Sequence, residues 1–192
     1  MRLVSGPGSL KLVCILALIA APLSAERMDL EIDPAATKVN WTLGDVLHTV
    51  HGTFKLKKGD LWFDSGTGQA GGLLVVDAAS GESGNGARDG RMHKHVLESA
   101  RYPEITFAPD RVVGSVARSG DSEVQLHGIF TIHGGTHELL MKVKSHIDQQ
   151  KLTAIVSFSV PYVSWGMKDP SNFLLKVKNS VDIYIAASGR VK

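Results

Sequence analysis

Apolar and polar residues alternate with a period of two along most of this chain, the pattern of β-strands that bury one face. Val39, Trp41 and Leu43, for example, are separated by Asn40 and Thr42. Similar or denser apolar runs occur at 50–56, 61–63, 73–76, 105–107, 124–132, 139–143, 152–160 and 181–185. Such a series predicts an all-β protein, an antiparallel barrel of about eight strands whose interior can hold a small ligand. A β-sandwich gives the same short alternating strands and is the main alternative.

Two pairs of strands are predicted to form hairpins. The first turn is expected at Lys58-Gly59 and the second at Gly134-Gly135, because glycine supplies the backbone conformations that two-residue turns require. These turns would make the following residues face one another: Leu56 and Leu61, Phe54 and Phe63, Phe130 and Leu139, Gly128 and Met141, Leu126 and Val143. Both hairpins would then present one continuous apolar face.

A single helix interrupts the strands and is predicted from about Arg88 to Ala100, with Tyr102-Pro103 ending it and Asn85 or Ser83 capping its start. Its apolar positions are Met92, Val96, Leu97 and Ala100. One interpretation is that this apolar stripe plugs or flanks the barrel. A second, compatible interpretation is a moving lid, whose approach gains backbone freedom from Gly81, Gly84, Gly86 and Gly90.

The N-terminal residues have the pattern of an export signal. Arg2 and Lys11 precede the apolar run 12–18, and small residues lead to an expected cut after Ala25. The run is shorter than the roughly 18 residues that a membrane anchor needs. We therefore expect a signal peptide at 1–25, one mature domain at 26–192 without a stable membrane anchor, and a periplasmic or secreted location.

Charge and cysteine content narrow the classes of function. The chain has 21 Lys and Arg against 19 Asp and Glu, and the two extra cations, Arg2 and Lys11, belong to the predicted signal. The mature part is therefore balanced, which argues against a nucleic-acid partner. Cys14 is the sole cysteine and also lies in the signal, so no disulfide, thiolate nucleophile or cysteine metal site is expected in the mature domain.

The eight histidines do not form a metal site by their spacing, so neither a metal nor another cofactor is expected. Three pairs either point to different faces or lie too far apart: His93 and His95, His48 and His51, His127 and His133. His137, placed opposite Ile132 by the predicted hairpin, would point inward near the rim. It is interpreted as a hydrogen-bonded rim residue.

No catalytic motif is present, since the chain has no Gly-x-Ser-x-Gly elbow, no His-Glu-x-x-His and no phosphate-binding loop of the Gly-Lys-Ser/Thr type. Asp77, Arg88 and Asp89 could act as acid, base and clamp. Charges at a junction between a strand and a helix are more often caps and local ion pairs. If a ligand carries a phosphate, the nearby basic candidates are Arg88, Arg91, Lys94, Arg101 and Lys168.

Several motifs occur in an order and spacing that resemble a known family. They are Ile32-Asp33-Pro34, His51-Gly52-Thr53-Phe54, Asp77-Ala78-Ala79-Ser80, Gly84-Asn85, Arg88-Asp89, Tyr102-Pro103-Glu104-Ile105-Thr106-Phe107 and Gly128-Ile129-Phe130-Thr131-Ile132-His133-Gly134. The chain resembles the YceI-like polyisoprenoid-binding proteins, which are exported. The resemblance implies an up-and-down, lipocalin-like barrel whose elongated apolar cavity holds a long isoprenoid chain or a similar amphiphile.

The expected function is therefore to carry or sequester an isoprenoid-like lipid without changing it chemically. The candidate lipid-binding residues are the inward apolar positions Trp41, Val50, Phe54, Leu56, Phe63, Val75, Phe107, Leu126, Phe130, Leu139, Met141, Val143, Val156 and Phe158. Three alternatives stay open at this point: a filled core that binds nothing, as in a structural stress-response protein; an enzyme acting on an amphiphile in the same cavity; and a homodimer in place of a monomer.

Overall fold

The computed structural model describes residues 27–44, 48–171 and 176–192, so the predicted signal peptide lies outside the described residues. In chain order the strands are β1 (Arg27–Ile32), β2 (Lys38–Gly44), β3 (Thr49–Asp64), β4 (Ala70–Glu82), β5 (Glu104–Val113), β6 (Gly120–Ile132), β7 (Gly135–Asp148), β8 (Lys151–Val160) and β9 (Val181–Val191). Between β4 and β5 come the helix α1 (Gly86–Arg91) and the π-helical turn η1 (Met92–Val96). Neither α1 nor η1 has the length and apolar character needed to cross a bilayer.

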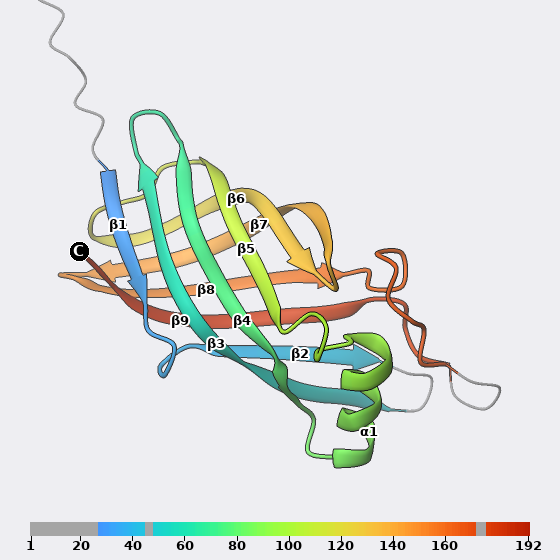
Figure 1. The fold of residues 1–192 in the computed structure, drawn as a ribbon. Coiled ribbons are helices and arrows are strands. Elements are labelled where there is room, and N and C mark those ends of the chain that lie inside the picture. The colour runs from blue at the N-terminus through green and yellow to red at the C-terminus, as the bar shows by residue number, and fades with distance from the viewer. Residues whose placement is uncertain (1–26, 45–47, 172–175) are drawn as a thin grey trace, which may run out of the picture.

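The strands form one closed antiparallel sheet, in the order β1-β3-β2-β9-β8-β7-β6-β5-β4 with β3 also paired to β4 (Figure 1). Two short strands share one position in the barrel wall. β2 pairs with the first part of β3 and β1 with its last part, and both also pair with β9. The barrel therefore has eight strand positions, which confirms the predicted barrel and excludes the sandwich.

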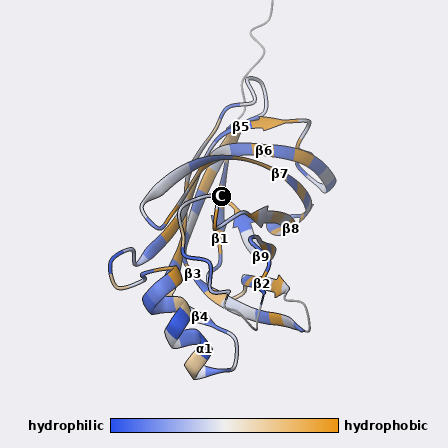
Figure 2. Ribbon diagram, turned by 90° about the vertical axis from the view of Figure 1, so that its right-hand side faces the viewer, coloured by the Kyte–Doolittle hydropathy of each residue, from blue (hydrophilic) through white to orange (hydrophobic). Residues whose placement is uncertain are grey.

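The helix lies at one end of the barrel, and the view of that end in Figure 2 shows the strands around a common centre with α1 to one side. Polar and apolar colours alternate along most strands, as the period of two predicts. On β6 the even positions from Val124 to Ile132 are buried or half-buried. On β7 the odd positions are buried or half-buried. The inward faces of β6 and β7 were therefore predicted correctly.

The first predicted hairpin is wrong. Lys58 and Gly59 lie in the middle of β3, which continues to Asp64 and pairs with β4, so that Phe63 faces Ala70. The turn comes after Asp64, whose carboxylate accepts hydrogen bonds from two backbone N–H groups of the turn at 2.9 Å. Close packing requires a glycine at position 59, because a Cβ there would lie 2.6 Å from Cβ of Ile32 on β1.

The second hairpin exists, but its register differs by two residues from the prediction. Its loop is His133-Gly134, with φ of 51° and 75°, the left-handed conformation that a two-residue type I′ turn needs at both positions. The observed facing pairs are Phe130 and His137, Gly128 and Leu139, Leu126 and Met141, Val124 and Val143. Because a shift of two preserves the face, the predicted inward residues still point inward.

The helix has the predicted cap, Asn85, but begins at Gly86, two residues before the predicted start, and it ends early. The side chain of Asn85 accepts a hydrogen bond from the backbone N–H of Arg88 at 3.1 Å, which caps α1. The last helical hydrogen bond runs from Leu97 N to the carbonyl of Met92, and Glu98 then adopts a φ of 46°. This left-handed residue stops the helix before the predicted end at Ala100.

Candidate ligand-binding cavity

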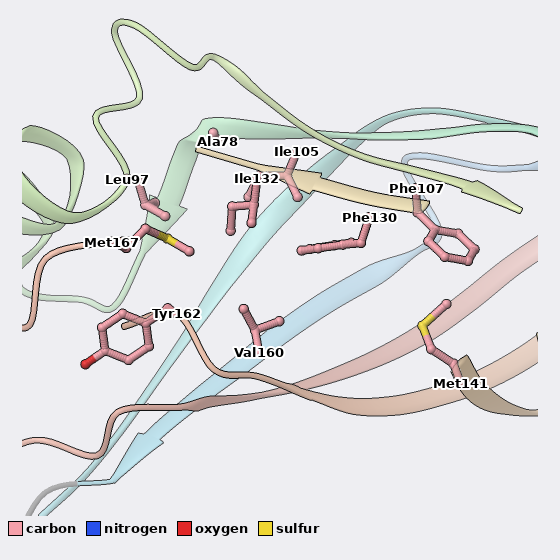
Figure 3. Packing of buried hydrophobic residues seen from close by; sticks show 10 residues of the cluster. All are labelled: Ala78, Leu97, Ile105, Phe107, Phe130, Ile132, Met141, Val160, Tyr162 and Met167. Atoms are coloured by element: carbon pink, nitrogen blue, oxygen red, sulfur yellow. The ribbon is translucent and has the colours of Figure 1, made fainter. Parts of the chain in front are cut away.

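The barrel encloses two adjoining apolar hollows. The outer compartment, at the α1 end, has a volume of about 730 Å³, and the inner compartment has about 170 Å³. They share the lining residues Val39, Val76, Ile105, Phe130, Phe158 and Ile185. Figure 3 shows part of the wall, with Leu97, Met167 and Tyr162 near the α1 end and Phe107 and Met141 further inside. The interior is thus a long hollow with apolar walls.

The inner compartment exists where small side chains from three strands line up. Ser145 on β7 faces Ala154 on β8, and Ala154 faces Ala187 on β9. All three line the inner compartment. The neighbouring inward row carries Val143 and Val156, whose longer side chains leave less room beside the wall.

Most of the predicted lipid-binding residues line the two compartments. The inner compartment contains Leu56, Phe63, Phe107, Leu126, Phe130, Met141, Val143, Val156 and Phe158. The outer compartment contains Trp41, Val50, Phe54, Phe130 and Phe158. The structure thus brings these side chains together around one space.

Val75 and Leu139 are absent from both linings. Val75 is buried, but its neighbours Leu74 and Val76 face the cavity, so Val75 points to the other side of β4. The dense apolar run at 73–76 gave no alternation from which to choose the inward face. Leu139 packs against the buried cluster that includes Phe130 without lining the hollow.

The helical segment closes part of the outer compartment. Met92, Val96 and Leu97 line it, which confirms the prediction that the apolar stripe flanks the barrel. Gly81 was predicted to give the lid backbone freedom. In the structure it allows close packing, since a Cβ there would lie 2.4 Å from Phe54 and 2.9 Å from Met92. A lid motion remains a prediction.

The irregular segment after β8 supplies wall residues that the sequence pattern did not reveal. Tyr162 and Met167 are buried and line the outer compartment. The Tyr162 hydroxyl donates to the carbonyl of Lys178 at 2.8 Å, and burial, with a smaller effect of the Asp169 charge, raises its pKa to about 12. Non-repetitive segments have no hydrophobic period, so their inward residues carry no signal.

Charged residues occur at the outer compartment. Of the predicted phosphate-binding candidates, Arg88, Arg91 and Lys168 line it, and Lys94 and Arg101 do not. The guanidinium of Arg101 instead lies 5.0 Å from the centre of the Tyr102 ring. The inner compartment has no charged residue among those that the structure places in its wall.

The candidate catalytic residues make local structural contacts. Asp77 accepts from the backbone N–H of Ala79 at 2.9 Å. Asp89 accepts from the backbone N–H of Ser83 at 3.1 Å and from its hydroxyl, and Arg88 donates to the same hydroxyl at 2.7 Å. Burial acts to raise the pKa of Asp89, but the hydrogen bonds from Ser83, aided by the Arg88 charge, outweigh burial and lower that pKa. These contacts fasten the helix start to the end of β4.

The histidines are spread over separate environments. His93 hydrogen-bonds the Gly81 carbonyl at 2.8 Å, whereas His95 lines the outer compartment. His137 faces Phe130 rather than Ile132 and stacks on Trp165 with ring centres 3.9 Å apart. Its Nε2 is buried without a hydrogen-bond partner, so the expected hydrogen-bonded rim residue is held by stacking. Within the described ranges no three His, Cys, Asp or Glu side chains are grouped as metal ligands would be.

A closed eight-position barrel with a helix at one end and a long apolar hollow is the architecture of small single-domain binding barrels. Within this class the chain belongs to the YceI-like domain family, whose sequence model matches residues 30–188. No curated protein matches the sequence.

Solved structures share the fold at low sequence identity. BcnA of Burkholderia cenocepacia is 16% identical, with a TM-score of 0.68 over 82% of this chain and 98% of its own. A polyisoprenoid-binding domain from Saccharophagus degradans, implicated in plant cell wall breakdown, is 16% identical, with a TM-score of 0.65 over 85% and 98%. The Campylobacter jejuni YceI protein is 12% identical, with a TM-score of 0.55 over 73% and 81%.

Proposed function

We propose that this protein binds a long apolar amphiphile, of isoprenoid-like type, in the barrel cavity and carries or sequesters it without chemical change. The observation that carries the proposal is the pair of adjoining, mainly apolar compartments inside the barrel, of which the outer one alone has about 730 Å³. This volume lies within the roughly 300–1,000 Å³ range of ligand pockets. The family membership and the fold shared with a polyisoprenoid-binding domain support the same assignment.

Packing energetics favour an apolar occupant. Protein interiors are normally close-packed, and wall atoms beside an empty space lose dispersion contacts. A hydrocarbon chain restores these contacts and is itself removed from water, at roughly 25 cal/mol per Å² of apolar surface buried. A filled core, the alternative that binds nothing, would leave no space of this kind.

Binding without chemistry fits the roles of the polar residues. Asp77 and Asp89 are engaged with nearby backbone N–H groups, and the cavity walls are mainly aliphatic and aromatic. We further propose a periplasmic or secreted location, on the basis of the signal-like pattern in residues 1–25.

Two measurements on the mature chain test the proposed function. Gently purified protein, extracted with organic solvent, is expected to release a long-chain lipid that mass spectrometry identifies. After delipidation, the apolar fluorescent probe 1-N-phenylnaphthylamine is expected to bind saturably and to be displaced by geranylgeraniol. Protein that yields no lipid and binds no probe would contradict the proposal.

A further inference from the structure

Two residues with an unusual backbone conformation meet beside the helical segment. Besides glycine, three residues of the described chain have a positive φ: Glu98 (46°), His133 (51°) and Gln149 (55°). Histidine in a type I′ turn suits this conformation, whereas Glu98 stands at a helix end where glycine or asparagine is usual. Backbone outliers of this kind cluster at functional sites. Because the side chains of Glu98 and His133 also meet, the pair is a candidate for such a site.

The contact joins the chain after η1 to the hairpin between β6 and β7. Nε2 of His133 lies 3.5 Å from Oε1 of Glu98. The His133 side chain is 17% exposed, and its Nε2 is buried without a hydrogen-bond partner in the described structure. A carboxylate therefore stands close to a buried imidazole nitrogen without bonding it. Protonation would place a positive charge on the ring and make both nitrogens donors, so that the two groups form an ion pair.

The other ionisable groups around His133 leave Glu98 as its partner. Nη1 of Arg101 lies 3.8 Å from Oε2 of Glu98, the oxygen that does not face His133. The ring of Tyr102 contacts the imidazole, with ring centres 4.7 Å apart. Glu104, at the start of the neighbouring strand β5, is already in an ion pair at 2.7 Å with a lysine of β3. Among the described carboxylates, Glu98 is therefore the one placed to receive a protonated His133.

Glu98 is also placed to restrain the helical cover, residues 86–97, which closes part of the outer compartment. Leu97 comes directly before it, is 8% exposed and lines the compartment. Ser99 comes directly after it, and its hydroxyl hydrogen-bonds Nδ1 of His93 in η1 at 3.1 Å. The other ring nitrogen of His93 bonds the carbonyl of Gly81 on β4 at 2.8 Å. A tie between Glu98 and the β6–β7 hairpin would therefore hold the cover in place from its C-terminal end.

We infer that Glu98 and His133 form a pH-sensitive latch, which holds the helical cover closed when the imidazole is protonated. This inference rests on the proposed function and adds a regulation of ligand exchange. Imidazole groups take up their proton between about pH 8 and pH 5, whereas carboxylates stay ionised over most of this range. The latch is therefore weak at the alkaline end and strong at the acid end. A bound ligand should leave faster as the pH rises.

The release rate of bound 1-N-phenylnaphthylamine tests the latch, measured by stopped flow with excess geranylgeraniol as the competitor. Wild-type protein is expected to release the probe about fivefold more slowly at about pH 5.5 than at about pH 8. In Glu98→Gln this ratio should fall toward one. It should also fall toward one in His133→Asn, because asparagine accepts the left-handed turn conformation but takes up no proton. Since both changes remove the same contact, the double variant should behave like each single variant.

The matched control is His127→Asn. His127 also belongs to β6, is 18% exposed and has its Nδ1 2.6 Å from the carboxylate of Asp110, but it lies in the middle of the strand. This variant should keep the wild-type ratio of release rates. His93 and His95 of η1 are unchanged in every variant. A pH dependence that arises from them would therefore persist in Glu98→Gln and would overturn the latch.

Hydrogen–deuterium exchange of residues 92–102 in the lipid-free protein gives a second readout, which needs no ligand. After correction for the intrinsic pH dependence of exchange, protection should be greater at the acid pH in wild type and equal at both pH values in Glu98→Gln. If wild-type release is independent of pH, or if its pH dependence survives in either variant, the latch is wrong and lipid binding stands. If the probe binds at neither pH, the proposed function fails, and the exchange measurement alone supports or overturns the latch.

Discussion

Single residues set the width of the outer compartment, and Gly52 shows how. It pairs with Trp41 across β2 and β3, and a Cβ on Gly52 would lie 2.3 Å from Cε2 of Trp41 and 2.3 Å from the carbonyl oxygen of Glu82. The indole therefore lies against the bare backbone of β3. Trp41 is 5% exposed and forms part of the cavity wall, so a larger residue at position 52 would push the ring into the hollow.

We expect Gly52→Ala to destabilise the protein by about 1–3 kcal/mol, the usual cost of inserting a methyl group into a packed site. Urea unfolding followed by tryptophan fluorescence measures the change. The control is Gly90→Ala in α1, where a Cβ meets nothing within 4 Å and alanine should stabilise the helix by about 0.5–1 kcal/mol. Equal unfolding free energies for the two variants would show that the close contact at position 52 is unimportant.

At the scale of elements, the start of α1 is held by a compact set of contacts. Asn85 caps the helix, and both Arg88 and Asp89 hydrogen-bond Ser83, which follows the end of β4. His93 adds a further link to the Gly81 carbonyl. These contacts fix the helical segment whose apolar side chains close the outer compartment.

Asp89→Asn should destabilise the protein by about 1–3 kcal/mol at neutral pH, because the hydrogen bonds of Ser83 to the carboxylate are charge-assisted. The pKa of Asp89 is lowered in the folded protein, so this contribution is complete above the pKa of a free aspartate, about 3.9. It is lost as the pH falls through the lowered folded value. The measurement is the difference in unfolding free energy between wild type and variant across this pH range.

That difference should shrink toward zero in acid, where the protonated Asp89 resembles Asn. The control Asp148→Asn changes an exposed carboxylate at the end of β7 and should leave the unfolding free energy nearly unchanged. A difference for Asp89→Asn that is independent of pH would mean that the charge of the carboxylate does not contribute.

The elements also show how far sequence patterns lead. Alternation located most of the strands and, on β6 and β7, the inward face, because side chains repeat every two residues whatever the turn. It missed β1 and divided β3 into two strands. The positions of the turns were harder to predict. Gly59 was interpreted as a turn residue, and its smallness instead reflects the approach of Ile32 from a distant part of the chain. The sequence alone does not distinguish a glycine that forms a turn from a glycine against which another residue packs.

For the whole molecule, closure and hollowness depend on how distant strands align. β1 and β2 occupy one position in the wall, which allows eight positions to close from nine strands. Within that wall Ser145, Ala154 and Ala187 stand side by side and leave the inner compartment open. The depth available to a lipid tail should therefore depend on this row of small residues.

Ala154→Phe should fill the inner compartment and weaken binding of long amphiphiles more than short ones. Displacement of 1-N-phenylnaphthylamine by geraniol and by geranylgeraniol measures this effect, and the variant should lose affinity chiefly for the longer alcohol. The neighbouring variant Ile155→Phe adds a ring on the outward face of β8, where Ile155 is 46% exposed, and should bind both alcohols normally. An equal loss for both alcohols in Ala154→Phe would show that the tail does not reach the inner compartment.

The sequence by itself determined the β-class of the protein, the inward face of most strands, the start of the helix and a large share of the cavity wall, because these follow from local periodicity and capping. Only the tertiary structure decided strand register, the sharing of one wall position by β1 and β2, and the hollow itself. Short side chains of the neighbouring strands β7, β8 and β9 lie side by side along the inner compartment, and the cations Arg91 and Lys168 line the outer compartment from segments more than seventy residues apart. Such coincidences depend on long-range pairing, which no local pattern encodes.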